Sequence, residues 1–129
     1  MFTKWLPIYQ QSGQTRVTAI VNERSPLTFT WSEASNQQTV LTAGAMDALG
    51  LHVPADAAQK TLKFGKSRTI AVRQITLETL RLGRCVVKSV VAHVLPPEGE
   101  DLGSRFGRTA LAEHSVRLEP ELLRMTIDA

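Results

Sequence analysis

Hydrophobic and polar residues alternate with a period of two along most of the chain, which is typical of half-buried β-strands. The clearest example is residues 27–32, where Leu27, Phe29 and Trp31 alternate with polar residues and therefore share one face. Residues 16–22 alternate in the same way, and the turn signal at residues 22–26 joins the two segments into a predicted hairpin.

Three further hairpins are expected, each built from two alternating segments around a short turn: residues 60–64 with 68–77, residues 80–82 with 85–95, and residues 116–118 with 123–127. The apolar positions of the second hairpin change phase between Val72 and Ile75. An extra residue in one strand would explain such a shift, so a β-bulge is predicted near residue 73 or 74.

Helical signals are few. Thr42 follows the short apolar segment 39–41 and is a suitable N-cap for a helix that ends at Leu49, with Gly50 as its left-handed C-cap. A second short helix is expected at residues 104–113, weakened by Gly107. About eight short strands with one or two short helices predict a mostly β fold that closes into a barrel.

Length and composition add limits to this prediction. The 129 residues are expected to form a single domain, since neither a linker nor a repeat divides them. A single cysteine, Cys85, excludes an internal disulfide, and the three histidines lack metal-ligand spacing, so neither a metal nor another cofactor is expected. No apolar run is long enough to span a membrane and no signal peptide is visible, so a cytoplasmic location is expected.

The net charge of +3 is mild, but basic residues concentrate at residues 60–88. A basic barrel that binds nucleic acid is therefore one alternative function. A solvated face of hairpins is the favoured interpretation, because only Phe64 is placed among these cations as a base-stacking residue. The triplet Gly65-Lys66-Ser67 matches the end of a phosphate-binding loop, but Lys60 replaces the first glycine and a strand follows, so that mechanism is rejected.

The order of motifs resembles the retropepsin-like aspartic proteases, a single-lobe family that includes the retroviral proteases. A strand, a polar loop, Thr39-Val40-Leu41 and a short helix ending in Leu49-Gly50-Leu51 follow one another as in that family. The segment 101–106 is similar to the family's Leu-Leu-Gly-Met-x-Phe, and the resemblance covers residues 14–128. It implies a closed acid-protease barrel and a homodimer with interleaved terminal strands, here residues 1–9 and 122–128. It also implies a flap over an extended peptide, made of Lys63, Phe64, Gly65, Lys66 and Ser67.

The catalytic position departs from this pattern. Alignment on Thr39 places Glu33, Ala34 and Ser35 where the family has Asp-Thr-Gly, so no catalytic residue is retained. The expected function is therefore a catalytically inactive module for peptide binding or assembly. Lys63, Lys66 and Arg68 of the flap would suit an acidic peptide. The alternative is a weak endopeptidase that uses Glu33 across a homodimer.

Overall fold

The structure is a computed structural model that describes residues 3–32, 38–111 and 114–128. Strands dominate it: β1 (Thr3–Pro7), β2 (Tyr9–Gln11), β3 (Gln14–Val21), β4 (Ser25–Ser32), β5 (Thr39–Leu41), β6 (Gln59–Phe64), β7 (Arg68–Leu82), β8 (Cys85–Val94), β9 (Arg105–Gly107), β10 (Ser115–Glu119) and β11 (Arg124–Asp128). The helical elements are short: α1 (Ala43–Leu49) and the 3-10 turns η1 (Pro97–Leu102), η2 (Arg108–Leu111) and η3 (Pro120–Leu122).

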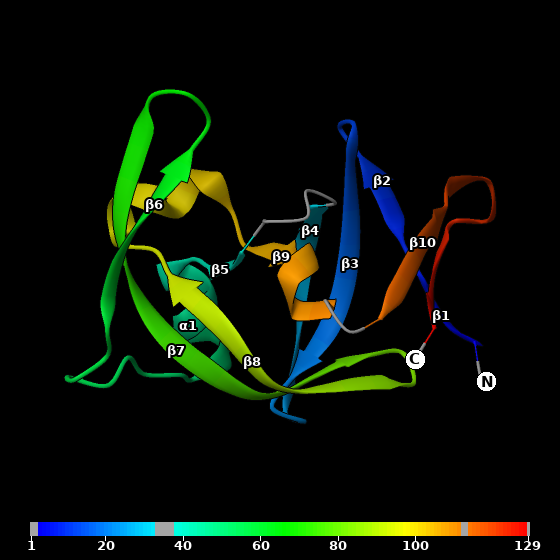
Figure 1. The fold of residues 1–129 in the computed structure, drawn as a ribbon, viewed down its shortest axis with the longest axis horizontal. Coiled ribbons are helices and arrows are strands. Elements are labelled where there is room, and N and C mark those ends of the chain that lie inside the picture. Colours follow the sequence, from blue (N-terminus) through cyan, green and yellow to red (C-terminus); the bar gives the residue numbers. More distant parts are fainter. Residues whose placement is uncertain (1–2, 33–37, 112–113, 129) are drawn as a thin grey trace.

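One sheet has the order β2-β3-β4-β9-β5-β8-β7-β6 (Figure 1). A further pairing of β3 with β7, at Ile20–Arg81 and Val21–Leu80, closes its middle strands into a ring. Two of its pairings, β4 with β9 and β5 with β8, are parallel and link segments far apart in the sequence. The predicted mostly β, closed architecture is confirmed.

A second sheet contains both terminal strands, in the order β1-β11-β10. β1 pairs with β11 from Thr3–Asp128 to Pro7–Arg124, and the predicted last hairpin is formed by β10 and β11. The terminal segments expected to interleave between subunits therefore pair with each other inside one chain. β1 and β10 lie at the two edges of this sheet, opposite the flap side of the molecule in Figure 1.

Apolar side chains form two clusters on different faces of the sheet. The larger surrounds Phe29, Trp31 and Phe106, and the smaller joins Val72 to Phe64 beneath the hairpin β6–β7. Ile75 packs on the larger cluster, so the phase of β7 changes because the strand passes from one cluster to the other. The register of β7 with β8 is constant through Arg73 and Gln74, and the pairing of β7 with β6 extends without a shift to Arg73, so the predicted bulge there is wrong.

The predicted caps of α1 are confirmed. The hydroxyl of Thr42 accepts a hydrogen bond from the amide of Ala45 at 3.1 Å, and Gly50 adopts a φ of 66°. The second predicted helix, at residues 104–113, is wrong over its described part, which contains β9 and the single turn η2; residues 112–113 lie outside the described residues. No helix of the described chain is long and apolar enough to cross a membrane.

Candidate functional site

The segment where the family resemblance places the catalytic residues lies between β4 and β5. Glu33, Ala34 and Ser35 themselves fall outside the described residues. The ends of the two flanking strands meet on β9, since Ser32 pairs with Gly107 and the amide of Gly107 donates to the Thr39 hydroxyl at 3.2 Å.

An aromatic cluster fixes β9 against β4 beneath this position. Trp31 stacks on Phe106 with ring centroids 5.3 Å apart, and Phe29 meets Phe106 edge-on at 5.9 Å. All three side chains are buried, so the face that Phe29 and Trp31 were expected to share points into the core. The other tryptophan, Trp5, is 59% exposed on β1.

The predicted flap is the hairpin of β6 and β7. Its turn contains Gly65 at a φ of 67°, a left-handed conformation that glycine adopts without a steric penalty. Phe64 is buried against the smaller cluster, whereas Lys63, Lys66 and Ser67 are exposed. The flap therefore has one buried apolar anchor and two solvated lysines.

Arg68 at the base of the flap is bound within the chain. Its guanidinium donates to both carboxylate oxygens of Asp101, at 2.7 and 3.0 Å, and to the carbonyl of Glu98 at 2.9 Å. The hydrogen bonds that the Asp101 carboxylate accepts from Arg68 lower the pKa of Asp101. Arg68, expected to contact an acidic peptide, instead ties the flap to Asp101 of η1.

Hydrogen bonds attach η1 to the N-terminal end of α1. The carboxylate of Glu100 accepts from the amide of Gly44 at 3.0 and 3.3 Å, and the hydroxyl of Ser104 accepts from the amide of Thr42 at 3.2 Å. A continuous set of polar contacts thus runs from the flap through η1 to the helix that follows β5.

Other members of the central basic run also bind within the chain. Arg73 donates to the carbonyls of Ala57 and Ala55, and Arg81 pairs with Glu23 at 3.0 Å. The run is therefore not a single free cationic surface, which weakens the nucleic-acid alternative.

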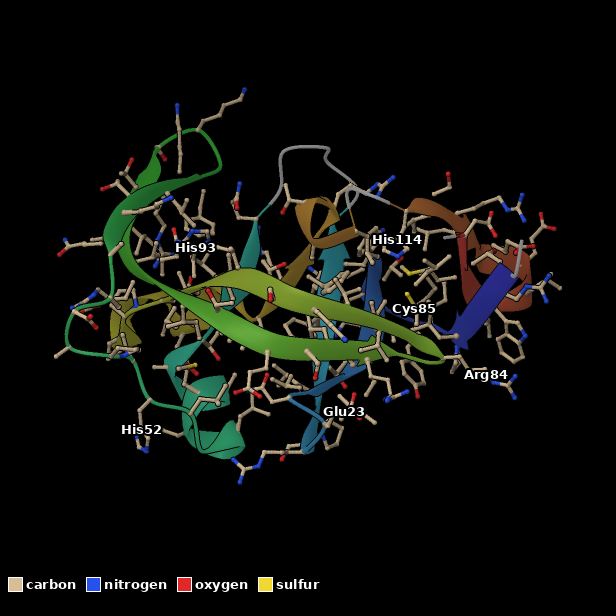
Figure 2. The ribbon with its side chains drawn as sticks, turned by 60° about the horizontal axis from the view of Figure 1, so that its bottom comes forward. Glu23, His52, Arg84, Cys85, His93 and His114 are labelled. Carbon is tan, nitrogen blue, oxygen red and sulfur yellow. The ribbon has the colours of Figure 1, made fainter. Side chains whose placement is uncertain are left out.

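His93 on β8 is buried between β5 and β7 (Figure 2). Burial lowers its pKa, opposed by a hydrogen bond with the backbone of Thr39, and its Nδ1 atom has no partner among the described residues. Cys85 is buried near the opposite end of β8 and forms no disulfide. Across the described residues, no group of three or more His, Cys, Asp or Glu side chains could hold a metal ion.

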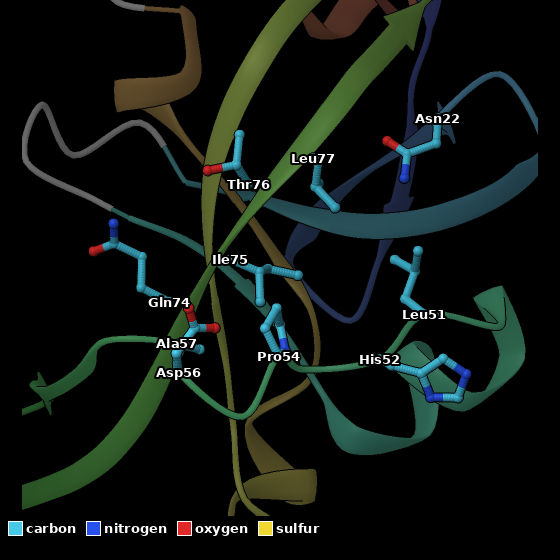
Figure 3. A pocket seen from close by; sticks show the side chains of 10 residues that line it. All are labelled: Asn22, Leu51, His52, Pro54, Asp56, Ala57, Gln74, Ile75, Thr76 and Leu77. Atoms are coloured by element: carbon cyan, nitrogen blue, oxygen red, sulfur yellow. The ribbon is translucent and has the colours of Figure 1, made fainter.

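A pocket of about 300 Å³ lies beside β7 (Figure 3), lined by Asn22, Leu51, His52, Pro54, Asp56, Ala57, Gln74, Ile75, Thr76 and Leu77. The Asn22 side chain carbonyl already accepts from the amides of Glu78 and Thr79. The remaining walls combine apolar side chains with the exposed His52 and Asp56. We find no hydrogen-bonded nucleophile and base among these lining residues.

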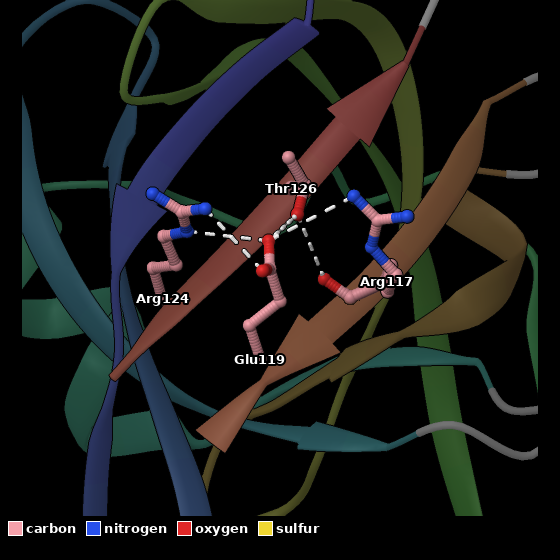
Figure 4. A network of polar contacts seen from close by, with 4 residues as sticks. All are labelled: Arg117, Glu119, Arg124 and Thr126. Atoms are coloured by element: carbon pink, nitrogen blue, oxygen red, sulfur yellow. Dashed lines mark hydrogen bonds and ion pairs between the residues drawn. The ribbon is translucent and has the colours of Figure 1, made fainter. Parts of the chain in front are cut away.

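A polar network links β10 and β11 of the terminal sheet (Figure 4). The carboxylate of Glu119 accepts from the Thr126 hydroxyl at 2.6 Å and from Arg124 at 3.2 Å, while Arg117 lies 3.9 Å away. Hydrogen bonds from Thr126 and then Arg124 lower the pKa of Glu119. These contacts hold the hairpin of β10 and β11 together.

Comparison with known proteins supports the fold. No protein-family model and no curated protein sequence matches the chain. Among solved structures, the chain is similar to the crystal structure of a retropepsin-like aspartic protease from Rickettsia conorii. The two superpose with a TM-score of 0.72 at 16% identity, over 98% of this chain and 91% of that one. The chain therefore has the retropepsin-like acid-protease fold that the motif order predicted.

Proposed function

We propose that the chain is a peptide-binding or assembly module with an acid-protease fold and without protease activity. One observation carries this proposal: the flap and its anchoring contacts are complete, whereas Glu33-Ala34-Ser35 stand at the position of Asp-Thr-Gly. The flap supports retained peptide binding, and the substituted triplet supports the loss of protease activity.

The triplet is unsuited to acid–base catalysis on three counts. Aspartic proteases use two carboxylates that share a proton, one as acid and one as base. Glu33 carries one methylene more than aspartate, and a misplacement of about 1 Å can cost roughly a hundredfold in rate. Ala34 has no hydroxyl to donate across a dimer, and Ser35 adds a side chain where glycine allows close backbone approach.

The proposed ligand is an extended peptide that lies beneath the flap and adds to the sheet as a strand. β6 is the last strand of its sheet and pairs, among the described strands, with β7 alone. Its free edge is therefore a candidate for main-chain hydrogen bonds to such a peptide. Lys63 and Lys66 are the two flap cations left exposed for an acidic ligand, because Arg68 is bound to Asp101.

A homodimer is the proposed form of assembly. The edges β1 and β10 of the terminal sheet are open to a second copy, and four large apolar side chains near it are more than half exposed: Trp5, Tyr9, Leu122 and Leu123. Sedimentation velocity at rising protein concentration tests this proposal. A chain that stays monomeric at the highest concentration contradicts it.

The functional test is cleavage of a peptide library from acid to neutral pH, with the Glu33→Gln variant as control. We expect no cleavage by either protein. Cleavage by the native chain that the variant lacks would make Glu33 a catalytic carboxylate and would establish the alternative, a weak endopeptidase. Binding to the same library, measured by fluorescence anisotropy, tests the peptide-binding half of the proposal.

A further inference from the structure

A row of directly paired residues crosses the sheet from β3 to β7, and every neighbouring pair in it is in register. In order, its members are Arg16, Thr30, Arg105, Val40, His93 and Gln74. Side chains of directly paired residues project from the same face of a sheet. Six positions that are far apart in the sequence therefore share one face.

This face is the one that the flap covers. Trp31 and Phe106, which follow Thr30 and Arg105 in the chain, stack in the larger cluster on the opposite face. Val40 belongs to the smaller cluster together with Phe64 of the flap. The row thus passes beneath Phe64.

Arg105 links the floor of this region to the flap. It is half-buried, and its guanidinium carbon lies 5.7 Å from the centroid of the Phe64 ring, in a cation–π contact. The guanidinium has neither an ion pair nor a hydrogen bond with any described residue. The guanidinium is therefore held against an aromatic ring, and its donors have no partner in the described part of the chain.

A second arginine lies on the other side of Thr30. Arg16 is also half-buried, and its Nε atom is buried with no partner in the described chain. Its Nη1 atom donates to the Thr30 hydroxyl at 3.4 Å, near the limit of a hydrogen bond. Two strand spacings, roughly 10 Å between Cα atoms, separate Arg16 from Arg105.

Arg16 and Arg105 have no acidic partner among the described residues, so these two half-buried cations repel each other, and within that part of the chain they have donors without partners. An anion between them would relieve both costs, and a planar carboxylate matches the paired donors of a guanidinium. We infer that Arg105, assisted by Arg16 across Thr30, binds a carboxylate of the peptide that lies beneath the flap. The inference rests on the proposed function and adds a ligand class to it: a peptide with an acidic side chain or a free C-terminus.

The roles of the other cations follow from their contacts. Arg68 is already bound to Asp101, so it supports the flap and does not contact the ligand. Lys63 and Lys66 are exposed, so they add attraction that salt screens. Selectivity for a carboxylate therefore depends on Arg105.

Three fluorescein-labelled decapeptide pools provide the probe. The first two are degenerate, N-acetylated and C-amidated, with a central residue fixed as Glu in one and Gln in the other. The third lacks acidic side chains and has a free C-terminal carboxylate. Binding to the full chain is measured by fluorescence anisotropy at 50 mM and 200 mM salt, for the native chain and the variants Arg105→Gln, Arg105→Lys and Arg84→Gln.

The native chain should bind the Glu pool about tenfold more tightly than the Gln pool, as a charge-assisted hydrogen bond implies. Arg105→Gln should remove this preference, and Arg105→Lys should restore part of it. Arg84 lies in the turn between β7 and β8, so Arg84→Gln removes one positive charge elsewhere and should keep the preference. Thermal melting of each variant shows that it is folded. If the third pool is preferred instead, and Arg105→Gln removes that preference, the bound carboxylate is the peptide terminus.

Equal binding of the three pools by the native chain would overturn the carboxylate site and leave peptide binding intact. A preference that survives in Arg105→Gln would also overturn it. Failure to bind any pool would overturn the proposed peptide-binding function itself, so the two failures are distinguishable.

Discussion

Truncating Phe106 tests the link between the core and the candidate site. Phe106 is fully buried on β9, stacks on Trp31 and meets Phe29 edge-on. β9 also contains Arg105 and lies against both ends of the segment with the degenerate triplet. Loss of this ring should therefore weaken the fold and loosen the strand that positions Arg105.

The magnitude follows from the burial of the ring. Replacing a fully buried phenylalanine by alanine costs about 3–5 kcal/mol, the sum of lost transfer free energy and the cavity left behind. A domain of this size has a free energy of unfolding of about 5–15 kcal/mol. The entropy of unfolding is about 2.1 cal/mol/K per residue, so Phe106→Ala should lower Tm by about 11–18 °C.

Urea denaturation followed by circular dichroism measures the free energy change, with Val91→Ala as the control. Val91 on β8 is 45% exposed and lies outside the proposed dimer surface, so its truncation should change stability by no more than about 0.5 kcal/mol. Tryptophan emission gives a local readout. A Trp5→Phe background removes the exposed indole, and Phe106→Ala should then shift the emission of Trp31 to longer wavelength. A folded Phe106→Ala variant that loses less than about 1 kcal/mol would refute the packing argument.

Three further predictions concern charge and backbone conformation. Because Arg68 lowers the pKa of Asp101, the ion pair that anchors the flap should be intact at neutral pH and should weaken only in acid, when Asp101 is protonated. The variant Asp101→Asn should therefore speed amide hydrogen exchange in the flap already at neutral pH. Burial lowers the pKa of His93, so the unfolded chain binds a proton more readily and the free energy of unfolding should fall as the pH drops below about 6.5. The variant His93→Leu should show a weaker pH dependence in urea midpoints measured from pH 5 to 7.5. Gly83 and Gly65 both have positive φ, but an added Cβ at Gly83 would lie 3.1 Å from a backbone oxygen, whereas Gly65 has open space. Thermal melting should therefore show a larger loss for Gly83→Ala than for Gly65→Ala, which should cost about 1 kcal/mol.

Local features of the fold were predictable because their causes are local. Alternation marked the faces of β3 and β4, and the caps Thr42 and Gly50 are one-residue signals with one conformational requirement each. The local sequence of residues 104–113 predicts a short helix weakened by Gly107. Pairing of β9 between β4 and β5 overrides that local preference.

The candidate site was harder to predict, because it depends on register between strands that are not neighbours in sequence. A period of two places Arg16 and Thr30 on the polar faces of their own strands, and the connecting turn of one hairpin aligns them. Nothing in the local pattern aligns Thr30 with Arg105, since this pairing is parallel and 75 positions separate the two residues. A shift of one residue in that register would turn Arg105 into the core and Phe106 toward the flap. Such a shift would remove the contacts of the Phe106 ring with both Trp31 and Phe29, so the packing of the aromatic core determines where the cation of the candidate site lies.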